Sequence, residues 1–496
     1  AGGMINRHLL LVYVATAAVL FAFFVTDYGR GSGEDLGRRL SESYQQHKDL
    51  FPMDSSDFWG TLTVTLGLLV AAAGGIGGGG ILVPLLILIF NFSPKFAVPL
   101  SNFTIVGSSI TNMVLNIPKR HPECDRPLVD WDLILVMEPL TMAGAIVGAF
   151  VSKVIPDWIL VISLVLLLAY TTHGTLEKGI SQFKSETIYF EGLKKSALTK
   201  AIEEDDDHGE RESLIDRVKE NEDSKPAAAE AGLIRDAGEK PSIAIAMPAD
   251  TNPELLALLE SERATPWDKV HMVTFMVVVV MALNLLKGGG AAFPSPLGIE
   301  CGGNGYWFLT ATVFVWVLSI SFYMRQVLID KWLLKKRLGY KYQKGDVEWN
   351  HRNTIIYPCI CFFAGFFAGL FGVGGGIVKG PLMLQMGVNP MVASATVAVM
   401  IMYTSVAATT MFVAFGTLTW DYGIFLFVLG LAATVVGQFG VSYLVVKYKR
   451  VSLISFSIGA VVALSTLLMG VQSVFTLIEM QTNPGSASST SSLCGN

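Results

Sequence analysis

Two glycine-rich stretches decide the fold of this chain: Gly75–Pro84 reads GIGGGGILVP, and Gly372–Pro381 reads GVGGGIVKGP. They align without a gap, and each ends on a proline. A little further along the chain, Ser93-Pro94 aligns with Asn389-Pro390 after a slip of one residue. Each stretch lies inside a long apolar segment, where glycine lets the backbone turn without steric cost. The sequence therefore contains an internal repeat, and each copy begins with a helical hairpin that is broken by glycines.

The composition is that of a membrane protein. Hydrophobic residues make up 52% of the 496 residues and charged residues only 16%, whereas soluble chains carry about a quarter charged residues. A helix needs roughly 20 apolar residues to span a bilayer. The apolar segments cover residues 9–25, 58–90, 96–117, 131–152, 157–174, 267–287, 306–329, 355–388, 391–415, 422–446 and 451–472. We therefore expect an all-α polytopic membrane protein.

The basic residues predict the orientation of the segments. The loop 330–352 and the turn 447–450 are both rich in lysine and arginine, so both should be cytoplasmic. Two spanning segments, 391–415 and 422–446, lie between them together with the segment 355–388. Both basic stretches can be cytoplasmic only if 355–388 enters the membrane and returns on the same side. Three spans of the first copy and two linking spans, within 267–329, then separate the two hairpins, and this odd number inverts the second copy. Inverted repeats with broken helices at matching positions are typical of alternating-access transporters.

The expected organisation follows from these spans. The order is a signal anchor or signal peptide (1–26), a non-cytoplasmic loop (27–57), repeat 1 (58–174), a disordered acidic cytoplasmic loop (177–265), two linking helices (267–329), a basic cytoplasmic loop (330–352), repeat 2 (355–472) and a disordered tail (481–496). Each repeat is a broken re-entrant hairpin followed by three transmembrane helices. The acidic loop, with its run Glu203–Asp207, is read as a solvated linker, and any protein partner would bind there. Cys301 and Cys494 could meet outside the membrane, but two unrelated thiols are the favoured reading.

The glycine breaks predict a place where an anion would bind. A helix that restarts at Ile81 or Ile377 presents free N–H groups and a positive dipole end to a cavity at membrane depth. Two such ends, facing each other from inverted repeats, would form an anion site near the midplane. Lys379 lies just beyond the second break and is a candidate site residue, because a charge at this depth is costly. The alternatives are a lysine that reaches the interface or one in a structural ion pair.

Polar stripes follow the two hairpins, with side chains spaced three or four residues apart on one helix face. Hydroxyl and amide donors in this pattern suit a hydrated path or an oxyanion site, and the alternative is hydrogen bonding between helices. The substrate-binding candidates are Ser101, Asn102, Thr104 and Ser108 in the first half, with Thr396 and Tyr403 in the second. Glu138, well inside a span, would carry a proton if transport is proton-coupled, or would lie close to the cytoplasmic boundary.

Together the two motifs, GGIGGGGILVPLL and FGVGGGIVKGPLM, resemble the sulfite exporter TauE/SafE family over 58–174 and 355–472. The resemblance implies transport of small sulfur-containing anions, such as sulfite or organosulfonates. It also implies a site between the repeats, formed by Gly77, Gly78, Gly79, Gly374, Gly375 and Gly376. The acidic loop and the extra N-terminal segment differ from compact bacterial members. They indicate a eukaryotic-type member in a plasma membrane or endomembrane.

A secondary transporter of small anions is thus the favoured reading. The alternatives are an anion channel, or a non-transporting scaffold or assembly subunit that retains the transporter fold. An enzyme is not expected, because HExxH, CxxC and nucleophile-elbow motifs are missing from the sequence. No cofactor or metal is predicted, and no basic, aromatic-rich domain suggests nucleic acid as a partner. The expected partners are the small anion and the lipid bilayer.

Overall fold

The computed structural model of the chain describes residues 50–74, 78–121, 124–205, 253–289, 294–340, 342 and 345–448, with the single residues 463, 466, 467, 469, 470 and 473. Within these ranges the secondary structure is helical, apart from one isolated bridge between Arg120 and Pro127. The predicted N-terminal segment, most of the loop after it, the C-terminal tail and most of the last predicted span lie outside the described residues.

The helices follow the predicted segments closely. The first half contains α3 (Ser55–Gly74), α4 (Gly79–Leu88), α5 (Pro94–Asn116), α6 (Trp131–Val154) and α7 (Asp157–Asp205). The second half contains α12 (Asn353–Phe371), α13 (Gly376–Gln385), α14 (Pro390–Ala414) and α15 (Trp420–Tyr448). Between them lie α9 (Pro253–Arg263), α10 (Trp267–Lys287) and α11 (Asn304–Arg337). Pro94 and Pro390 each open their helix, a position that proline favours because the missing N–H has no acceptor there.

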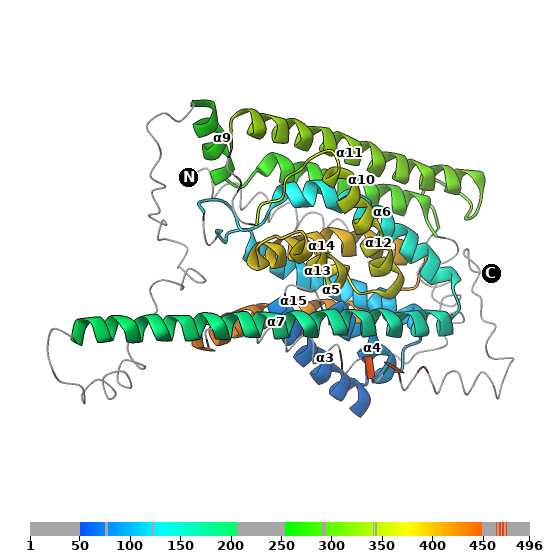
Figure 1. The fold of residues 1–496 in the computed structure, drawn as a ribbon. Coiled ribbons are helices and arrows are strands. Elements are labelled where there is room, and N and C mark those ends of the chain that lie inside the picture. Colours follow the sequence, from blue (N-terminus) through cyan, green and yellow to red (C-terminus); the bar gives the residue numbers. More distant parts are fainter. Residues whose placement is uncertain are drawn as a thin grey trace.

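The protein is an integral, multi-pass membrane protein. In the described part of the chain, seven helices are long and apolar enough to cross a bilayer: α6, the first part of α7, α10, α11, α12, α14 and α15. Figure 1 shows the helices of this bundle running side by side. The helix α5 falls outside this set because its polar stripe lowers its hydropathy, yet most of its residues are buried among the other helices. The all-α polytopic fold is thus confirmed.

Both glycine-rich segments are broken hairpins. Helix α3 ends at Gly74 and α4 begins at Gly79, while α12 ends at Phe371 and α13 begins at Gly376. A Cβ atom added to Gly60, near the start of α3, would lie 2.5 Å from the ring of Phe90, just beyond α4. In the second half, Gly345 precedes α12, and a Cβ there would lie 3.1 Å from the backbone N of Asn389, beyond α13. The two ends of each broken segment therefore lie close together, as a hairpin requires, and its re-entry on one side of a bilayer stays a prediction.

The contacts between helices repeat from one half to the other. If α3 to α6 correspond to α12 to α15, the packing of α6 on α12 matches that of α15 on α3. In the same way, α5 on α15 matches α14 on α6, and α5 packs on its own counterpart α14. This is the pattern that two related halves would give. The inversion of one half relative to the other across a bilayer stays a prediction.

The tightest of these contacts joins α6 to α12. A Cβ atom on Gly144 or Gly148 of α6 would lie 2.0 or 2.1 Å from a carbonyl oxygen of α12. Conversely, a Cβ on Gly365 or Gly369 of α12 would lie 1.8 or 2.0 Å from a carbonyl oxygen of α6. Glycines spaced four residues apart on both helices therefore let the two main chains touch, as small residues do at membrane helix interfaces.

Two expectations about the loops need correction. Helix α7 does not end near residue 174 but continues to Asp205, so the first part of the loop 177–265 is helical rather than disordered. Lysine and glutamate are the commonest residues in this part, and both favour helix. Figure 1 shows α7 projecting beyond the bundle, on the side where α9 also lies. The expectation for Cys301 is wrong too, because this residue is disulfide-bonded.

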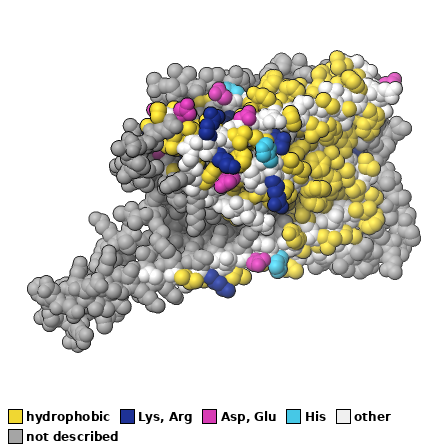
Figure 2. All heavy atoms as spheres, turned by 45° about the horizontal axis from the view of Figure 1, so that its top comes forward, with side chains coloured by type: hydrophobic (Ala, Val, Ile, Leu, Met, Phe, Trp, Pro, Cys, Tyr) yellow, Lys and Arg dark blue, Asp and Glu magenta, His cyan; other side chains and the backbone are white. Residues whose placement is uncertain are grey.

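Charged side chains gather at one end of the bundle. Figure 2 shows basic and acidic side chains beside a broad hydrophobic surface. The linking helices expose large hydrophobic side chains, such as Phe275, Phe308 and Val315. A large exposed apolar surface is what lipid contact requires of a spanning helix.

Candidate functional site

The two glycine breaks meet inside the bundle. Gly78, before α4, and Gly375, before α13, have φ angles of 76° and 72°, a left-handed conformation that favours glycine. A Cβ atom on Gly79 would lie 2.4 Å from the carbonyl carbon of Val373, so the first break touches the second. The contact between the two breaks is thus made at Gly79, while Gly77 lies outside the described residues.

The starts of α4 and α13 contribute positive dipole ends to this meeting point. In the first turn of any helix, the N–H groups have no acceptor within the helix, so Gly79 and Gly376 begin two such groups of donors. Apolar side chains also border the break, because a Cβ atom on Gly374 would lie 3.2 Å from Ile105 and 3.4 Å from Ile401. The arrangement combines polar helix ends with apolar walls, as small-molecule sites commonly do.

The polar stripe of α5 faces the breaks but uses most of its donors internally. The Ser101 hydroxyl donates to the carbonyl oxygen of Gly372 across a 2.7 Å contact, which ties α5 to the second break. Asn102 and Thr104 instead donate to carbonyl oxygens one turn earlier in α5, at 3.3 and 2.8 Å. The buried Oγ of Ser108 has no hydrogen-bond partner. Of the four candidates on α5, Ser101 is therefore the one bonded to a glycine break, and Ser108 is the one with an unused hydroxyl.

A buried ion pair joins α6 to α13. The Nζ atom of Lys379 lies 3.1 Å from Oε2 of Glu138, and both side chains have no exposed surface. Lys379 also donates to the Thr404 hydroxyl at 2.7 Å, and this hydroxyl contacts Oε1 of Glu138 at 2.5 Å. Glu138, Lys379 and Thr404 thus form a closed triad. Of the alternatives that the sequence left open for Lys379, the structure has the ion pair and not a side chain that reaches the interface.

The remaining two candidates lie away from the breaks. The Thr396 hydroxyl accepts a hydrogen bond from the backbone N–H of Asp130, at the beginning of α6, with a distance of 3.0 Å. The Tyr403 hydroxyl lies 3.2 Å from the hydroxyl of Thr274 on α10. Both residues are on α14, but these contacts connect α14 to its neighbours and not to the glycine breaks.

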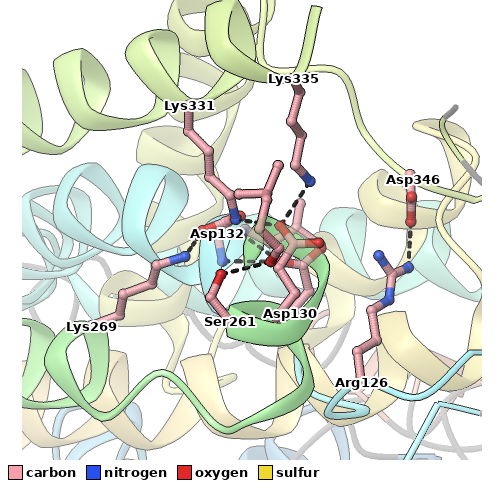
Figure 3. A network of polar contacts seen from close by, with 11 residues as sticks. Arg126, Asp130, Asp132, Ser261, Lys269, Lys331, Lys335 and Asp346 are labelled. Atoms are coloured by element: carbon pink, nitrogen blue, oxygen red, sulfur yellow. Dashed lines mark hydrogen bonds and ion pairs between the residues drawn. The ribbon is translucent and has the colours of Figure 1, made fainter. Parts of the chain in front are cut away.

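The structure adds a second polar region that the sequence did not single out. Asp132, in the first turn of α6, pairs with Lys269 of α10 and Lys331 of α11, as Figure 3 shows. Lys331 also lies 2.7 Å from Glu262 of α9, and Lys335 lies 2.9 Å from the same carboxylate. These residues line a cavity of about 600 Å³ between α6, α9, α10 and α11. The network fastens α9, the last part of the predicted acidic loop, onto the bundle.

Electrostatics keep the carboxylate of Glu262 ionised in this network. Burial by itself would raise the pKa of Glu262, but the ammonium groups of Lys331 and Lys335 outweigh burial and hold the pKa below its usual range. Nearby, burial raises the pKa of Asp130, and the adjacent carboxylate of Asp132 adds to this effect. Neighbouring carboxylates at one helix start therefore titrate differently, because only one of them has two lysine partners.

Comparison with known proteins gives a consistent picture. The profile of the family described as "Sulfite exporter TauE/SafE" matches residues 60–199 and 291–473. The chain is 28% identical to "Sulfite exporter TauE/SafE family protein 2" of Arabidopsis thaliana over 422 residues, which cover 82% of each chain. It is 27% identical to family protein 3 of the same plant over 411 residues, 83% of this chain and 77% of the relative.

A bacterial protein matches a shorter part of the chain. The "Probable membrane transporter protein YunE" of Bacillus subtilis (strain 168) is 37% identical over 79 residues, which cover 16% of this chain and 26% of that protein. No solved structure matches the chain.

Proposed function

This chain belongs to the sulfite exporter TauE/SafE family of membrane transporters, and we propose that it is a secondary transporter that moves a small anion by alternating access. The proposed substrates are sulfite or organosulfonate-like sulfur anions. The relatives are named as members of a sulfite exporter family, and the extension of that substrate class to this chain is part of the proposal.

One observation carries the proposal: two half-helices begin at the same buried place. The start of α4 at Gly79 touches the second break at Val373, and α13 begins three residues later at Gly376. The positive ends of α4 and α13 would both attract the charge of an anion that occupies this point. A small anion with several oxygen atoms can accept hydrogen bonds from both ends at once, which favours an oxyanion over a neutral solute.

The triad of Glu138, Lys379 and Thr404 supplies a way to couple anion movement to a proton. While Glu138 is ionised, its carboxylate is the counter-ion of the Lys379 ammonium. Protonation of Glu138 would remove the negative charge and free Lys379 to attract the anion, which would take over the role of counter-ion. Proton and anion would then bind together, and for a monovalent anion, such as hydrogen sulfite or an organosulfonate, the buried site would have the same net charge whether empty or loaded. Retaining that net charge avoids the high cost of an unpaired charge at membrane depth.

The test is uptake of labelled sulfite, sulfate and an organosulfonate into proteoliposomes that contain the purified protein. Uptake against an anion gradient, driven by an imposed pH gradient, is the expected result. Replacing Lys379→Ala should reduce uptake at least tenfold, whereas Lys336→Ala, on the exposed end of α11, should leave it unchanged. Movement only down the anion gradient would indicate a channel, and no movement of any of the three anions would remove the proposed substrate class.

A further inference from the structure

A second buried lysine lies at the other end of the linking helices. Lys287 is the last residue of α10, where a lysine side chain usually extends to the membrane surface and leaves its ammonium in water. Here the side chain is only 1% exposed. Lys269, in the ion-pair network of Figure 3, is near the opposite end of the same helix. At 1.5 Å per residue, the two lysines are about 30 Å apart along α10.

The surroundings of Lys287 hold no carboxylate partner among the described residues. Its Nζ atom lies 4.7 Å from the centre of the Phe150 ring and 5.0 Å from that of Tyr306. The nearest polar atom is Sδ of Met411 at 3.7 Å, which is a weak acceptor. This environment differs from that of Lys379, whose ammonium has a carboxylate and a hydroxyl as partners. The two aromatic rings attract a cation, but they do not neutralise it.

Two further polar side chains lack partners in the same place. Asn284 is fully buried, and neither Oδ1 nor Nδ2 has a hydrogen-bond partner. It lies three residues before Lys287 and therefore on the same face of α10. The buried hydroxyl of Tyr306, whose ring lies under the Lys287 ammonium, also has no partner. An ammonium whose one acceptor is a thioether thus lies over the ring of Tyr306, and an unpartnered amide shares its face of α10.

Each of these three groups can donate a hydrogen bond, and an anion would accept from all of them. A buried cation without a counter-ion is unfavourable, and each unsatisfied buried donor adds to the cost of leaving the place empty. We propose that Lys287, Asn284 and Tyr306 form a second binding site for a small inorganic oxyanion such as sulfite or sulfate. The assignment of a sulfur oxyanion rests on the proposed function. The site would hold the anion at the end of the bundle opposite to the Asp132 network.

The site is tested by anion-dependent thermal unfolding of the full-length protein in detergent. Sodium sulfate and sodium sulfite are titrated at constant ionic strength, with sodium gluconate as the replacement salt. We expect sulfate and sulfite to raise the unfolding temperature in a saturable way. Lys287→Met should weaken the apparent affinity at least tenfold. Lys95→Met is the matched control, because Lys95 lies at the same end of the bundle and has Asp157 as a partner at 3.8 Å; it should leave the titration unchanged.

A second variant covers the case in which Lys287→Met fails to fold. Tyr306→Phe keeps the aromatic ring and removes one hydroxyl, and it should weaken the apparent affinity severalfold. An unchanged titration in folded Lys287→Met, or stabilisation by gluconate as large as by sulfate, would overturn the site. Such a result would mean that Lys287 is a neutral amine held among aromatic rings.

Transport measured on the same preparations separates the two proposals. If sulfate or sulfite raises the unfolding temperature in a way that depends on Lys287, but the protein moves no anion, the result would support the site and contradict the transport function. Uptake with unchanged KM in Lys287→Met, together with an unchanged titration, would leave the transport function intact and remove the site.

Discussion

The carboxylate of Glu138 on α6 and the ammonium of Lys379 on α13 lie 3.1 Å apart, and both are fully buried. Glu138 is in a continuous helix, whereas Lys379 follows the break between α12 and α13. The pair therefore connects a rigid span to a short half-helix that could tilt at its glycines. Thr404 of α14 contacts both partners and adds a third helix to the connection.

Breaking this pair from one side should be more harmful than removing it entirely. Glu138→Gln or Lys379→Met alone leaves one buried group without its counter-ion, and we expect a loss of about 3–5 kcal/mol in stability. The double variant should recover most of this loss, because a neutral pair of similar size needs no counter-ion. Thermal unfolding of the two single variants and the double variant in detergent checks the prediction as a double-mutant cycle. Additive losses would mean that the two residues do not interact.

The contact between the two breaks should not tolerate a side chain at Gly79. A methyl group there would meet the backbone of Val373 at 2.4 Å, so Gly79→Ala must push the two breaks apart. We expect a loss of about 1–3 kcal/mol in stability and a strong loss of uptake. Gly380→Ala, on α13, is the matched control: it meets nothing within 4 Å and should be neutral or stabilising by about 0.5–1 kcal/mol. Equal effects of the two variants would contradict the contact.

The docking of α9 should depend on pH through Glu262. Its pKa is lowered in the folded protein, so its stabilising effect is fully present above the unfolded value of about 4.3 and is lost as pH falls through the folded pKa. Glu262→Gln should therefore lower the unfolding temperature at pH 7, and the difference from the unchanged protein should shrink below about pH 4. Unfolding curves of both proteins between pH 7 and pH 3.5 provide the measurement. Glu260→Gln, an exposed neighbour, should show no such dependence.

The hydrogen bond from Ser101 to the second break should contribute to its geometry. Ser101→Ala removes the donor to the carbonyl of Gly372 and should cost about 1 kcal/mol. Ser109→Ala is a suitable comparison, because the Ser109 hydroxyl donates at 2.9 Å to Val106 within its own helix. We expect this second change to have a smaller effect on both unfolding temperature and uptake. Similar losses in both variants would show that the bond to Gly372 has no special role.

The fold was largely predictable because its signals are local. Runs of about 20 apolar residues, prolines at helix starts and glycines at the breaks each mark a feature within a few residues of sequence. The repeat predicted two half-helix ends that face each other, but the direct contact between Gly79 and Val373 comes from the structure. The helical extension of α7 to Asp205 was missed, because a charged segment after a span is equally compatible with a disordered loop.

The partners of the candidate residues were much less predictable. Glu138 and Lys379 were each identified as costly charges, but nothing local in the sequence says that α13 packs its lysine against the middle of α6. Thr404 was not among the candidates selected from the second polar stripe, although its contacts place it in the triad. The Asp132 network was missed because an acidic residue in a first helical turn is common, and its lysines come from two other helices.

The glycine-lined seam between α6 and α12 has a consequence for how the molecule would work. Two main chains with no side-chain layer between them cannot slide or roll against each other without losing contact along two turns. The pair of helices must then travel as one rigid body, and that body holds Glu138 and leads directly into the second break. Movement of Lys379 relative to this body would then require α13 to rotate about Gly374 and Gly375, where the backbone has left-handed φ angles. Any gate in this molecule would then be a hinge of two glycines, and the pair of helices α6 and α12 would be the rigid scaffold around it.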